Sequence, residues 1–215
     1  MRRRTTIPLP RLMLVTDRQR TRGRDLVDLV ARAVRGGVGI VQLREPDLPD
    51  DELRELLQRI RERVPPSTTI VVNTSLRVAR TARVGLHLPA RAAALGDVDL
   101  GGAPFGRSVH DDEELRCALA DAADYLVAGT IFTTESKPGR APGGVALLER
   151  ICRQGHPTPV YAIGGVTVSR VPAVVRAGAH GVAVCGALLA ARDPERLAQA
   201  MTLALDVASC SSATR

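Results

Sequence analysis

The sequence predicts a single compact (β/α)8 barrel, an α/β fold in which parallel strands alternate with helices. Short β-branched runs alternate with longer amphipathic segments from residue 12 to residue 208. Eight such runs occur in the 215 residues, and eight strands are the number that closes this barrel. The runs are apolar without strict alternation, which is typical of parallel strands buried on both faces.

Each expected strand is an apolar run bounded by Gly, Pro, Asp or Asn. Runs of this kind between helical segments indicate βα units and a parallel sheet. The expected strands are residues 12–17, 39–44, 69–73, 84–88, 104–109, 125–132, 159–165 and 181–186.

Amphipathic segments predict a helix after every strand except the fourth, which is followed by PARAAALGD, enough for one turn at most. An open dinucleotide-binding sheet is the alternative, but VTDRQRTRGRD after the first strand lacks the glycine pattern GxGxxG. The expected helices are residues 24–36, 50–63, 75–82, 111–121, 144–154, 167–177 and 193–208.

Nothing in the sequence divides the chain into two domains. We expect one barrel domain over residues 11–208, a disordered basic tail over 1–10 and a C-terminal tail over 209–215. No apolar run of 18 residues predicts a membrane span, and the N-terminus lacks the apolar core of a signal peptide. Four scattered cysteines without a CxxC pair argue against a zinc site and for a reducing, cytoplasmic location.

The net charge of +7 raises the question of nucleic-acid binding. The arginines are mixed with acids along the helices, as in DDELRELLQRIRER, so they form no single basic stripe. Two Phe and two Tyr are too few for a base-stacking surface, and no nucleic-acid-binding motif is present. We therefore expect neither a nucleic-acid partner nor a membrane partner.

Chemistry in such barrels lies at the carboxyl ends of the strands, and phosphate often binds after strands seven and eight. Gly164 and Gly165 end the seventh expected strand, and Cys185 and Gly186 end the eighth. Glycine lets backbone amides approach an anion closely, so these turns predict a phosphate site. The alternative is that the glycines only serve tight turns between strand and helix.

The second and third expected strands place polar residues at the same end. Gln42 and Arg44 lie on one face of their strand because side chains alternate with period two. Arg44 can hold a carboxylate or phosphate with two parallel hydrogen bonds. Alternatively it forms an ion pair at the rim with Glu45 or Asp47. Asn73 ends the next strand.

The fifth expected strand ends in GRSVHDDEEL, with Ser108 and His110 at the barrel mouth. Asp111 followed by Glu114 has the pattern of a capping box, which places His110 just before a helix. A histidine there can act as a general acid or base near neutral pH, or it can simply hydrogen-bond a neighbouring loop. His87 poses the same question.

The single lysine of the chain, Lys137, follows the sixth expected strand beside Thr134 and Ser136. The other 29 basic residues are arginines, so a lysine here is informative. A compact ammonium group on a flexible stem reaches oxygens where a planar guanidinium does not fit. No histidine–cysteine cluster with metal spacing and no nucleophile elbow is present.

Together these segments resemble the thiamine phosphate synthase/TenI family of (β/α)8 barrels. The resemblance runs from Leu12 to about residue 190 and rests on LVTD, GGVGIVQLRE, VGLHLP, GRSVH, ADYLVAGTIFTTESKPG, VYAIGGVT and AGAHGVAVCGAL. It implies that Gln42, Arg44, Asn73, Ser108, Thr134, Ser136 and Lys137 bind substrate. It also implies that Gly164, Gly165, Cys185 and Gly186 bind phosphate.

The family that the sequence resembles has two branches with different chemistry. The synthase branch joins a pyrimidine pyrophosphate to a thiazole phosphate and holds Mg²⁺ with two aspartates. Here Thr74 replaces the first aspartate, HLPARAA replaces the motif that carries the second, and Pro46 replaces a lysine. Mg²⁺ needs hard oxygen ligands. HLPARAA and GRSVH instead resemble the TenI branch, whose members are thiazole tautomerases that need no metal. This resemblance implies that His110 is the catalytic base, and we expect the chain to belong to this branch.

On this hypothesis the protein is an isomerase without a cofactor that acts on a small phosphorylated thiazole, and the resemblance implies a homo-oligomer. Two alternatives stay open. One is a thiamine phosphate synthase with rearranged metal ligands, which would bring Mg²⁺ back. The other is a non-catalytic, regulatory protein that binds thiazole or thiamin phosphates, because a barrel can keep its phosphate site after losing its chemistry.

Overall fold

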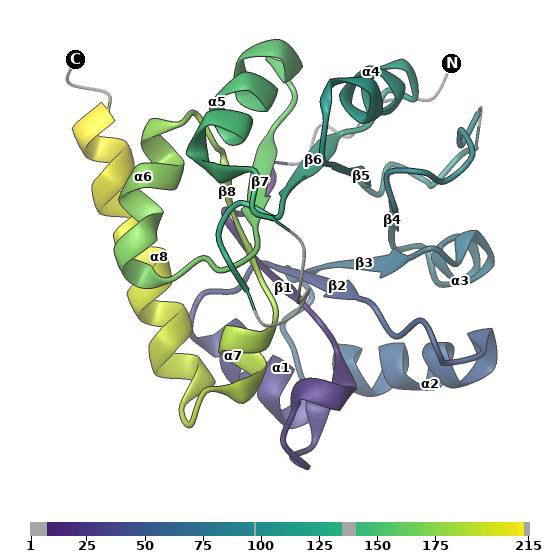
Figure 1. The fold of residues 1–215 in the computed structure, drawn as a ribbon. Helices are drawn as coiled ribbons and strands as arrows, with labels where there is room; N and C mark the ends of the chain where they lie inside the picture. Colours follow the sequence, from purple (N-terminus) through teal and green to yellow (C-terminus); the bar gives the residue numbers. More distant parts are fainter. Residues whose placement is uncertain (1–7, 97, 135–140, 213–215) are drawn as a thin grey trace.

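The computed structural model describes residues 8–96, 98–134 and 141–212, and these form a closed barrel of eight parallel strands in sequence order, with helices outside (Figure 1). Each strand pairs with its neighbours in sequence, and β1 pairs with β8. The predicted fold is therefore confirmed. The strands are β1 (Leu12–Val15), β2 (Ile40–Leu43), β3 (Thr69–Asn73), β4 (Gly85–Leu88), β5 (Phe105–Val109), β6 (Tyr125–Gly129), β7 (Val160–Ile163) and β8 (Gly181–Val184).

The helices follow the prediction with four differences. A short 3-10 helix, η1, follows β1 at the barrel mouth, and the expected helix 167–177 is divided into η2 and α6. The last helix is preceded by the short α7 and continues to Ser212, inside the expected C-terminal tail. The elements are η1 (Arg18–Arg20), α1 (Leu26–Arg35), α2 (Asp50–Arg61), α3 (Leu76–Ala82), α4 (Asp112–Ala120), α5 (Gly144–Gly155), η2 (Val168–Arg170), α6 (Val171–Arg176), α7 (Gly186–Ala190) and α8 (Pro194–Ser212).

Polar side chains fix where several helices begin. The Asp25 carboxylate accepts a hydrogen bond from the Asp28 N–H at the start of α1, and Ser75 does the same for Val78 at the start of α3. Each bond satisfies a backbone donor that has no partner inside the helix, which contributes about 1 kcal/mol. Among the described residues between β4 and β5 no helix forms, as PARAAALGD predicts.

Side chains of the strands form two separate cores. Outward-facing residues pack beneath the helices in one large apolar cluster. Inward-facing residues fill the barrel itself and include two tyrosines that are fully buried, Tyr125 and Tyr161. A Cβ at Gly106 would lie 2.1 Å from the Tyr125 ring, so the missing side chain makes room for that tyrosine. The barrel interior is a packed core, as is typical of this fold.

Residues just before β1 close the amino-terminal end of the barrel. The Tyr161 hydroxyl donates to the Pro10 carbonyl (2.6 Å), and His180 Nε2 donates to the Leu9 carbonyl (2.8 Å). Arg11 donates to the Leu205 carbonyl of α8 (2.8 Å). Of the expected N-terminal tail 1–10, residues 1–7 lie outside the described residues, and residues 9 and 10 are bound to the barrel. The carboxyl ends of the strands form the opposite, open end.

Candidate active site

Two amides from neighbouring strands meet at the carboxyl end of the barrel. Gln42 on β2 is 3% exposed, and its Oε1 accepts a hydrogen bond from Asn73 Nδ2 on β3 (3.2 Å). The Gln42 Nε2 lies 3.7 Å from the sulfur of Met13 in the barrel interior. The two predicted residues are thus brought together, and their contact fixes which way each amide points.

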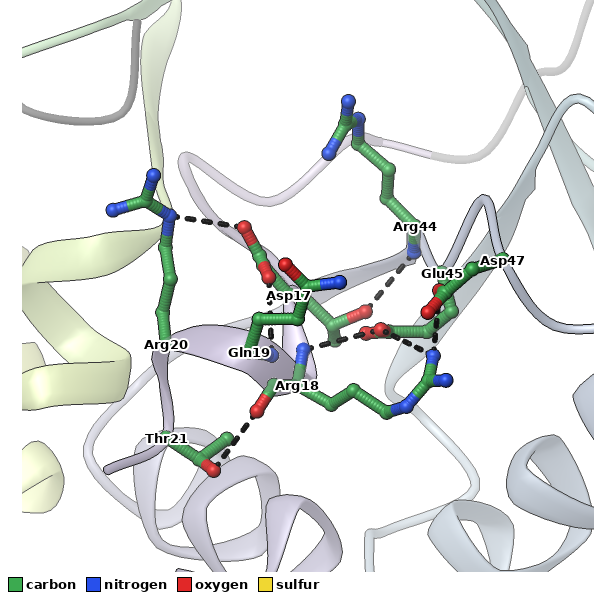
Figure 2. A network of polar contacts seen from close by, with 9 residues as sticks. Asp17, Arg18, Gln19, Arg20, Thr21, Arg44, Glu45 and Asp47 are labelled. Atoms are coloured by element: carbon green, nitrogen blue, oxygen red, sulfur yellow. Dashed lines mark hydrogen bonds and ion pairs between the residues drawn. The ribbon is translucent and has the colours of Figure 1, made fainter. Parts of the chain in front are cut away.

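Arg44 follows β2 and is exposed at the rim. Its backbone N–H donates to the Thr16 hydroxyl (3.0 Å), which ties the ends of β1 and β2 together. Its guanidinium extends away from the neighbouring acids in Figure 2. Within the described residues those acids pair with Arg18 instead, at 3.5 Å for Glu45 and 2.7 Å for Asp47. The rim ion pair considered for Arg44 is therefore not formed, and its cation is available to a ligand.

A cavity of about 650 Å³ lies where the phosphate site was predicted, between the ends of β6, β7 and β8. Gly164 and Gly165 have φ of +99° and +61°, and a Cβ on Gly165 would lie 2.4 Å from the Thr133 carbonyl oxygen. These turns therefore require glycine for local geometry, and the same turns leave backbone exposed to the cavity. The predicted residues that line it are Thr134, Gly164, Gly165, Cys185 and Gly186.

Three arginines that the sequence did not single out also line this cavity: Arg20, Arg22 and Arg170. Arg20 Nε donates to the Asp17 carboxylate (2.9 Å), and Figure 2 shows the rest of its guanidinium directed away from that pair. Arg170 donates to the Gly165 carbonyl (2.6 Å) and lies 4.7 Å from the centre of the Phe132 ring. The cavity therefore combines glycine backbone with positive charge, which suits a phosphate.

Cys185 lies at the end of β8 with its thiol largely buried. Burial raises the pKa of this thiol to about 12, so it is neutral at physiological pH. A neutral thiol does not repel an anion in the cavity. It is also a poor nucleophile, because the thiolate is the reactive form.

His110 is held by the helix that follows it. Its backbone N–H and its Nδ1 both contact the same oxygen of Glu114, at 2.8 and 2.7 Å. Asp111 caps α4 by accepting from the Glu114 N–H (2.8 Å), as the capping pattern predicts. His110 is thus close to the mouth, and its two contacts with Glu114 fix the start of α4.

Ser108 points inward from β5 and meets a buried histidine. His87 on β4 is 1% exposed, and its Nε2 lies 2.9 Å from the Ser108 hydroxyl. On the other side, His87 Nδ1 lies 3.2 Å from the Tyr125 hydroxyl. Burial, with smaller effects from the charges of Arg107 and Arg44, lowers the pKa of His87 to about 3. His87 is therefore a neutral member of the interior.

The loop after β4 is anchored from beneath by Arg107. This arginine on β5 is 2% exposed and forms an ion pair with Asp121 at the end of α4. Its Nη2 donates to the backbone carbonyls of Pro89 (3.4 Å), Ala90 (3.2 Å) and Ala92 (2.5 Å). We call this arrangement the Arg107 clamp; it fixes a loop that the sequence suggested was unusual.

The residues that the structure describes do not fit the Mg²⁺ site that the synthase branch implies. Among the described residues, no group of three or more His, Cys, Asp or Glu side chains is placed to hold a metal ion. Thr74 has the left-handed φ of +72°, which β-branched residues rarely adopt and which suits Asn or Asp better. HLPARAA, which replaces the motif that carries the second aspartate, includes Ala92 of the loop that Arg107 holds. We therefore derive no step through Mg²⁺.

Ser136 and Lys137 lie outside the described residues. The remaining predicted residues divide into three groups at one end of the barrel: the amide pair with Arg44, the Ser108–His87 contact, and the cavity of the glycine turns. Sequence reasoning missed Arg20 because one arginine among 29 carries little contrast. Its position three residues after Asp17, in the loop after β1, is the only signal that could have found it.

The sequence model of the family described as thiamine monophosphate synthase (TMP-TENI) matches residues 12–188. The chain belongs to this family. A protein of Geobacter sulfurreducens named putative thiamine-phosphate synthase is 36% identical over 198 residues, covering 88% of this chain and 92% of its own. The thiamine-phosphate synthase of Mycobacterium tuberculosis is 36% identical over 217 residues, with 93% and 96% covered.

A solved structure supports the same family. The thiamine phosphate pyrophosphorylase of Pyrococcus furiosus superposes with a TM-score of 0.77 at 26% identity, covering 92% of this chain and 96% of its own. Across the described residues, no helix of this thiamine monophosphate synthase family member is long and apolar enough to cross a membrane.

The comparisons correct the functional hypothesis. The tautomerase assignment is wrong: relatives about 35% identical over nearly the whole chain are named as synthases. The comparisons support an enzyme, and they do not support the isomerase class or the TenI branch. The missing aspartates, the lysine replaced by Pro46, and the likeness of HLPARAA and GRSVH to the TenI branch do not decide the reaction class. A pair of ligand positions can change while the barrel mouth around it is retained.

Proposed function

We propose that the chain is a thiamine-phosphate synthase that joins a pyrimidine pyrophosphate to a thiazole phosphate. Similarity to named synthases over about nine-tenths of the chain supports this reaction. The observation in the fold that carries the proposal is the cavity of about 650 Å³, where glycine turns and arginines meet at the carboxyl ends of β6 to β8. The reaction breaks the bond between the methylene carbon attached to the pyrimidine ring and the pyrophosphate oxygen, and the thiazole nitrogen forms the new bond to that methylene carbon.

The thiazole phosphate would bind in the cavity of the glycine turns. Backbone of Gly164, Gly165 and Gly186 would surround the phosphate, with Arg20 supplying positive charge. Cys185 lines the same cavity as a neutral thiol, and Thr134 lies on its β6 side.

The pyrophosphate leaving group would lie toward β2 and β5. Arg44 is exposed and without an ion pair among the described residues, and Ser108 faces the same mouth. Ser136 and Lys137, which the family resemblance implicates, would approach from the loop after β6. Gln42 and Asn73, already bonded to each other, would orient the pyrimidine ring. Cations are needed here because the leaving group carries several negative charges.

His110 needs a different role in this reaction. Joining the two substrates moves no proton from a ring carbon, so the base that the tautomerase hypothesis assigned to His110 has no task. Its bonds to Glu114 support a positioning role at the start of α4.

The test is direct synthesis by the purified protein. Pyrimidine pyrophosphate and thiazole phosphate are incubated with excess Mg²⁺ in one arm and with EDTA in the other. Thiamine phosphate is measured by its conversion to fluorescent thiochrome, and pyrophosphate release is measured in parallel. We expect thiamine phosphate and pyrophosphate to form in equal amounts, with Mg²⁺, with EDTA, or in both arms.

An Arg44→Ala variant and its matched Arg44→Lys partner separate positive charge from geometry. The alanine variant should lower turnover by at least about tenfold, because a charge-assisted hydrogen bond contributes about 1.5–3 kcal/mol. The lysine variant should recover part of the loss.

In the synthesis experiment, absence of thiamine phosphate both with Mg²⁺ and with EDTA, with the wild-type protein folded, would contradict the proposal.

A further inference from the structure

A column of aromatic and imidazole rings fills the barrel interior below the mouth. His87 stacks on Tyr125 with ring centres 5.6 Å apart, and Tyr125 meets Tyr161 edge to face at 5.7 Å. His87 is 1% exposed and both tyrosines are 0% exposed. Ser108, which is half-buried and faces the mouth, contacts the upper end of this column.

Hydrogen bonds connect Tyr125, His87 and Ser108 in a line. The Tyr125 hydroxyl lies 3.2 Å from His87 Nδ1, and His87 Nε2 lies 2.9 Å from the Ser108 hydroxyl oxygen. In the described chain, no further partner is recorded for the Tyr125 hydroxyl or for the Ser108 hydroxyl. The direction of each bond therefore depends on where the one proton of the neutral His87 ring resides.

Burial decides the direction at the lower end. A tyrosine hydroxyl has one proton to donate, and inside the barrel His87 Nδ1 is the one acceptor recorded for it among the described residues. If Nδ1 carried the ring proton, the Tyr125 proton would be buried without a partner, which is unfavourable. Tyr125 therefore donates to Nδ1, and the ring proton is on Nε2.

The upper end follows from the lower one. With its proton on Nε2, His87 donates to the Ser108 oxygen and cannot accept the Ser108 proton. Ser108 must then direct its own O–H to another acceptor, and the open side is the mouth. The low pKa of His87, which burial lowers to about 3, keeps the ring neutral over the working pH range, so this direction does not reverse.

We propose that Tyr125 and His87 are positioning residues that set Ser108 as a hydrogen-bond donor toward an anionic oxygen of the substrate at the barrel mouth. The role of Ser108 rests on the proposed function, with a pyrophosphate oxygen as the acceptor. The direction of the two bonds inside the protein, from Tyr125 to His87 and from His87 to Ser108, does not depend on the proposed function, because it follows from burial and distance.

The first experiment reads the ring proton directly and needs no activity. Long-range ¹H–¹⁵N correlation spectra of the imidazole rings in the full-length protein distinguish the two neutral tautomers. We expect the Nε2–H form for His87, assigned by its loss in His87→Gln. In Tyr125→Phe the ratio of the Nε2–H to the Nδ1–H tautomer should fall by at least about tenfold, because no buried tyrosine O–H then needs Nδ1 as its acceptor. An Nδ1–H form in the wild type would overturn the proposal.

The second experiment measures the consequence for turnover. Tyr125→Phe should lower kcat about tenfold with little change in KM for the thiazole phosphate, since the hydrogen bond that it disturbs forms on the pyrophosphate side. Ser108→Ala should cause a similar loss, and the double variant should lose no more than the larger single loss, because both act through one bond. If the losses of kcat in the two single variants add in the double variant, Tyr125 does not act through Ser108 and the proposal is overturned.

Tyr161→Phe is the matched control. It also removes a buried tyrosine hydroxyl, from the neighbouring ring. That hydroxyl donates to the Pro10 carbonyl at the opposite end of the barrel (2.6 Å). It should leave kcat within about twofold of the wild type. If it lowers kcat as much as Tyr125→Phe, the effect is general loosening of the core and the proposal fails.

His87→Gln tests rescue. A glutamine amide has an oxygen that can accept from Tyr125 and an N–H that can donate to Ser108. It should retain at least about fivefold more kcat than His87→Leu, with thermal unfolding of both variants checking that the barrel is folded. Equal kcat in these two folded variants would contradict the proposal. If no variant or wild type makes thiamine phosphate, the proposed function fails, and the tautomer measurement still decides the bond direction.

Discussion

The two halves of the barrel mouth are built from different material. On the β6 to β8 side, the cavity depends on backbone: Gly164 and Gly165 adopt positive φ, and a Cβ on either would lie within 2.6 Å of the β6 loop. On the β2 to β5 side, the surface consists of side chains, with the Gln42–Asn73 pair on β2 and β3 and the Arg107 clamp on β5. The first half is fixed by chain geometry and the second by side-chain identity.

This difference explains which half departs from the family pattern. A backbone-built site changes only when the turn itself changes, whereas a carboxylate ligand is lost with a single substitution. Thr74 and the 89–92 loop lie on the side-chain half, where the expected Mg²⁺ ligands are missing. The glycine turns on the other half match the family resemblance. Variants that separate the two halves test this division.

The largest effect is expected from Arg107→Met, which breaks the side-chain half from beneath. The substitution leaves the buried Asp121 carboxylate without its cation and the loop carbonyls without their donor. Breaking a buried ion pair costs about 3–5 kcal/mol, so the free energy of unfolding should fall by that amount in urea titrations. Arg91→Met, with its side chain 94% exposed, should change it by less than about 0.5 kcal/mol. A loss below 1 kcal/mol for Arg107→Met would refute the clamp.

Gly165→Ala breaks the backbone half. Alanine at φ +61° is strained, and its Cβ would lie 2.4 Å from the Thr133 carbonyl oxygen. We expect a loss of about 2–3 kcal/mol in unfolding free energy and at least a tenfold higher KM for thiazole phosphate. Gly101→Ala is the control, because Gly101 has a similar φ of +63° with open space around it. Equal losses in both variants would show that strain, and not the close contact, is responsible.

Arg20→Ala removes one of the three arginines that line the cavity of the backbone half without touching its glycine turns. The KM for thiazole phosphate should rise about 10- to 100-fold, because a charge-assisted hydrogen bond contributes about 1.5–3 kcal/mol. The KM for the corresponding thiazole alcohol should stay unchanged, since it has no phosphate. Arg35→Ala removes an exposed arginine that pairs with Glu195 on α8, and it should change neither value. An equal rise in the KM for the phosphate and for the alcohol would show that Arg20 does not contact the phosphate group.

The smallest effect concerns Thr74, where the side-chain half retains an unusual backbone. Its φ of +72° suits Asn better than a β-branched residue, so Thr74→Asn should raise the free energy of unfolding by about 1 kcal/mol. Arg83→Asn is the control, because Arg83 also has a positive φ of 52° but an unbranched side chain, and its gain should be smaller. A loss of stability in Thr74→Asn would show that the Thr74 hydroxyl bond to Asn73 outweighs the strain.

The fold could be predicted from the sequence because apolar runs and amphipathic segments are local patterns. Each of the eight expected strands overlaps an observed one, and the missing helix after β4 is visible in PARAAALGD. The exceptions have local causes. Helix α8 extends past residue 208 because ASCSS contains no helix breaker, and the divided segment 167–177 has Pro172 near the start of α6.

The site could be predicted only in part, because its arrangement depends on contacts between distant residues. The strand-end rule selects Gln42, Asn73 and Ser108 correctly for position. It does not reveal that Arg107 points outward to hold a loop, or that Tyr125 lies beneath His87, since both are set by strand pairing across the barrel. The reaction class does not follow from the missing ligands, because a few ligand positions can change while the rest of the chain stays similar to named synthases.

The Arg107 clamp has a consequence for how such enzymes diversify. Its guanidinium binds only main-chain oxygens in the 89–92 loop, and every amino acid supplies the same oxygen. The anchor is therefore indifferent to which side chains the loop carries, and residues 89 and 91 are exposed. Mutations there can add or remove chemical groups above the mouth without weakening the barrel wall. A library that randomises this short loop should consequently yield mostly folded proteins, which makes it a practical position for selecting new substrates.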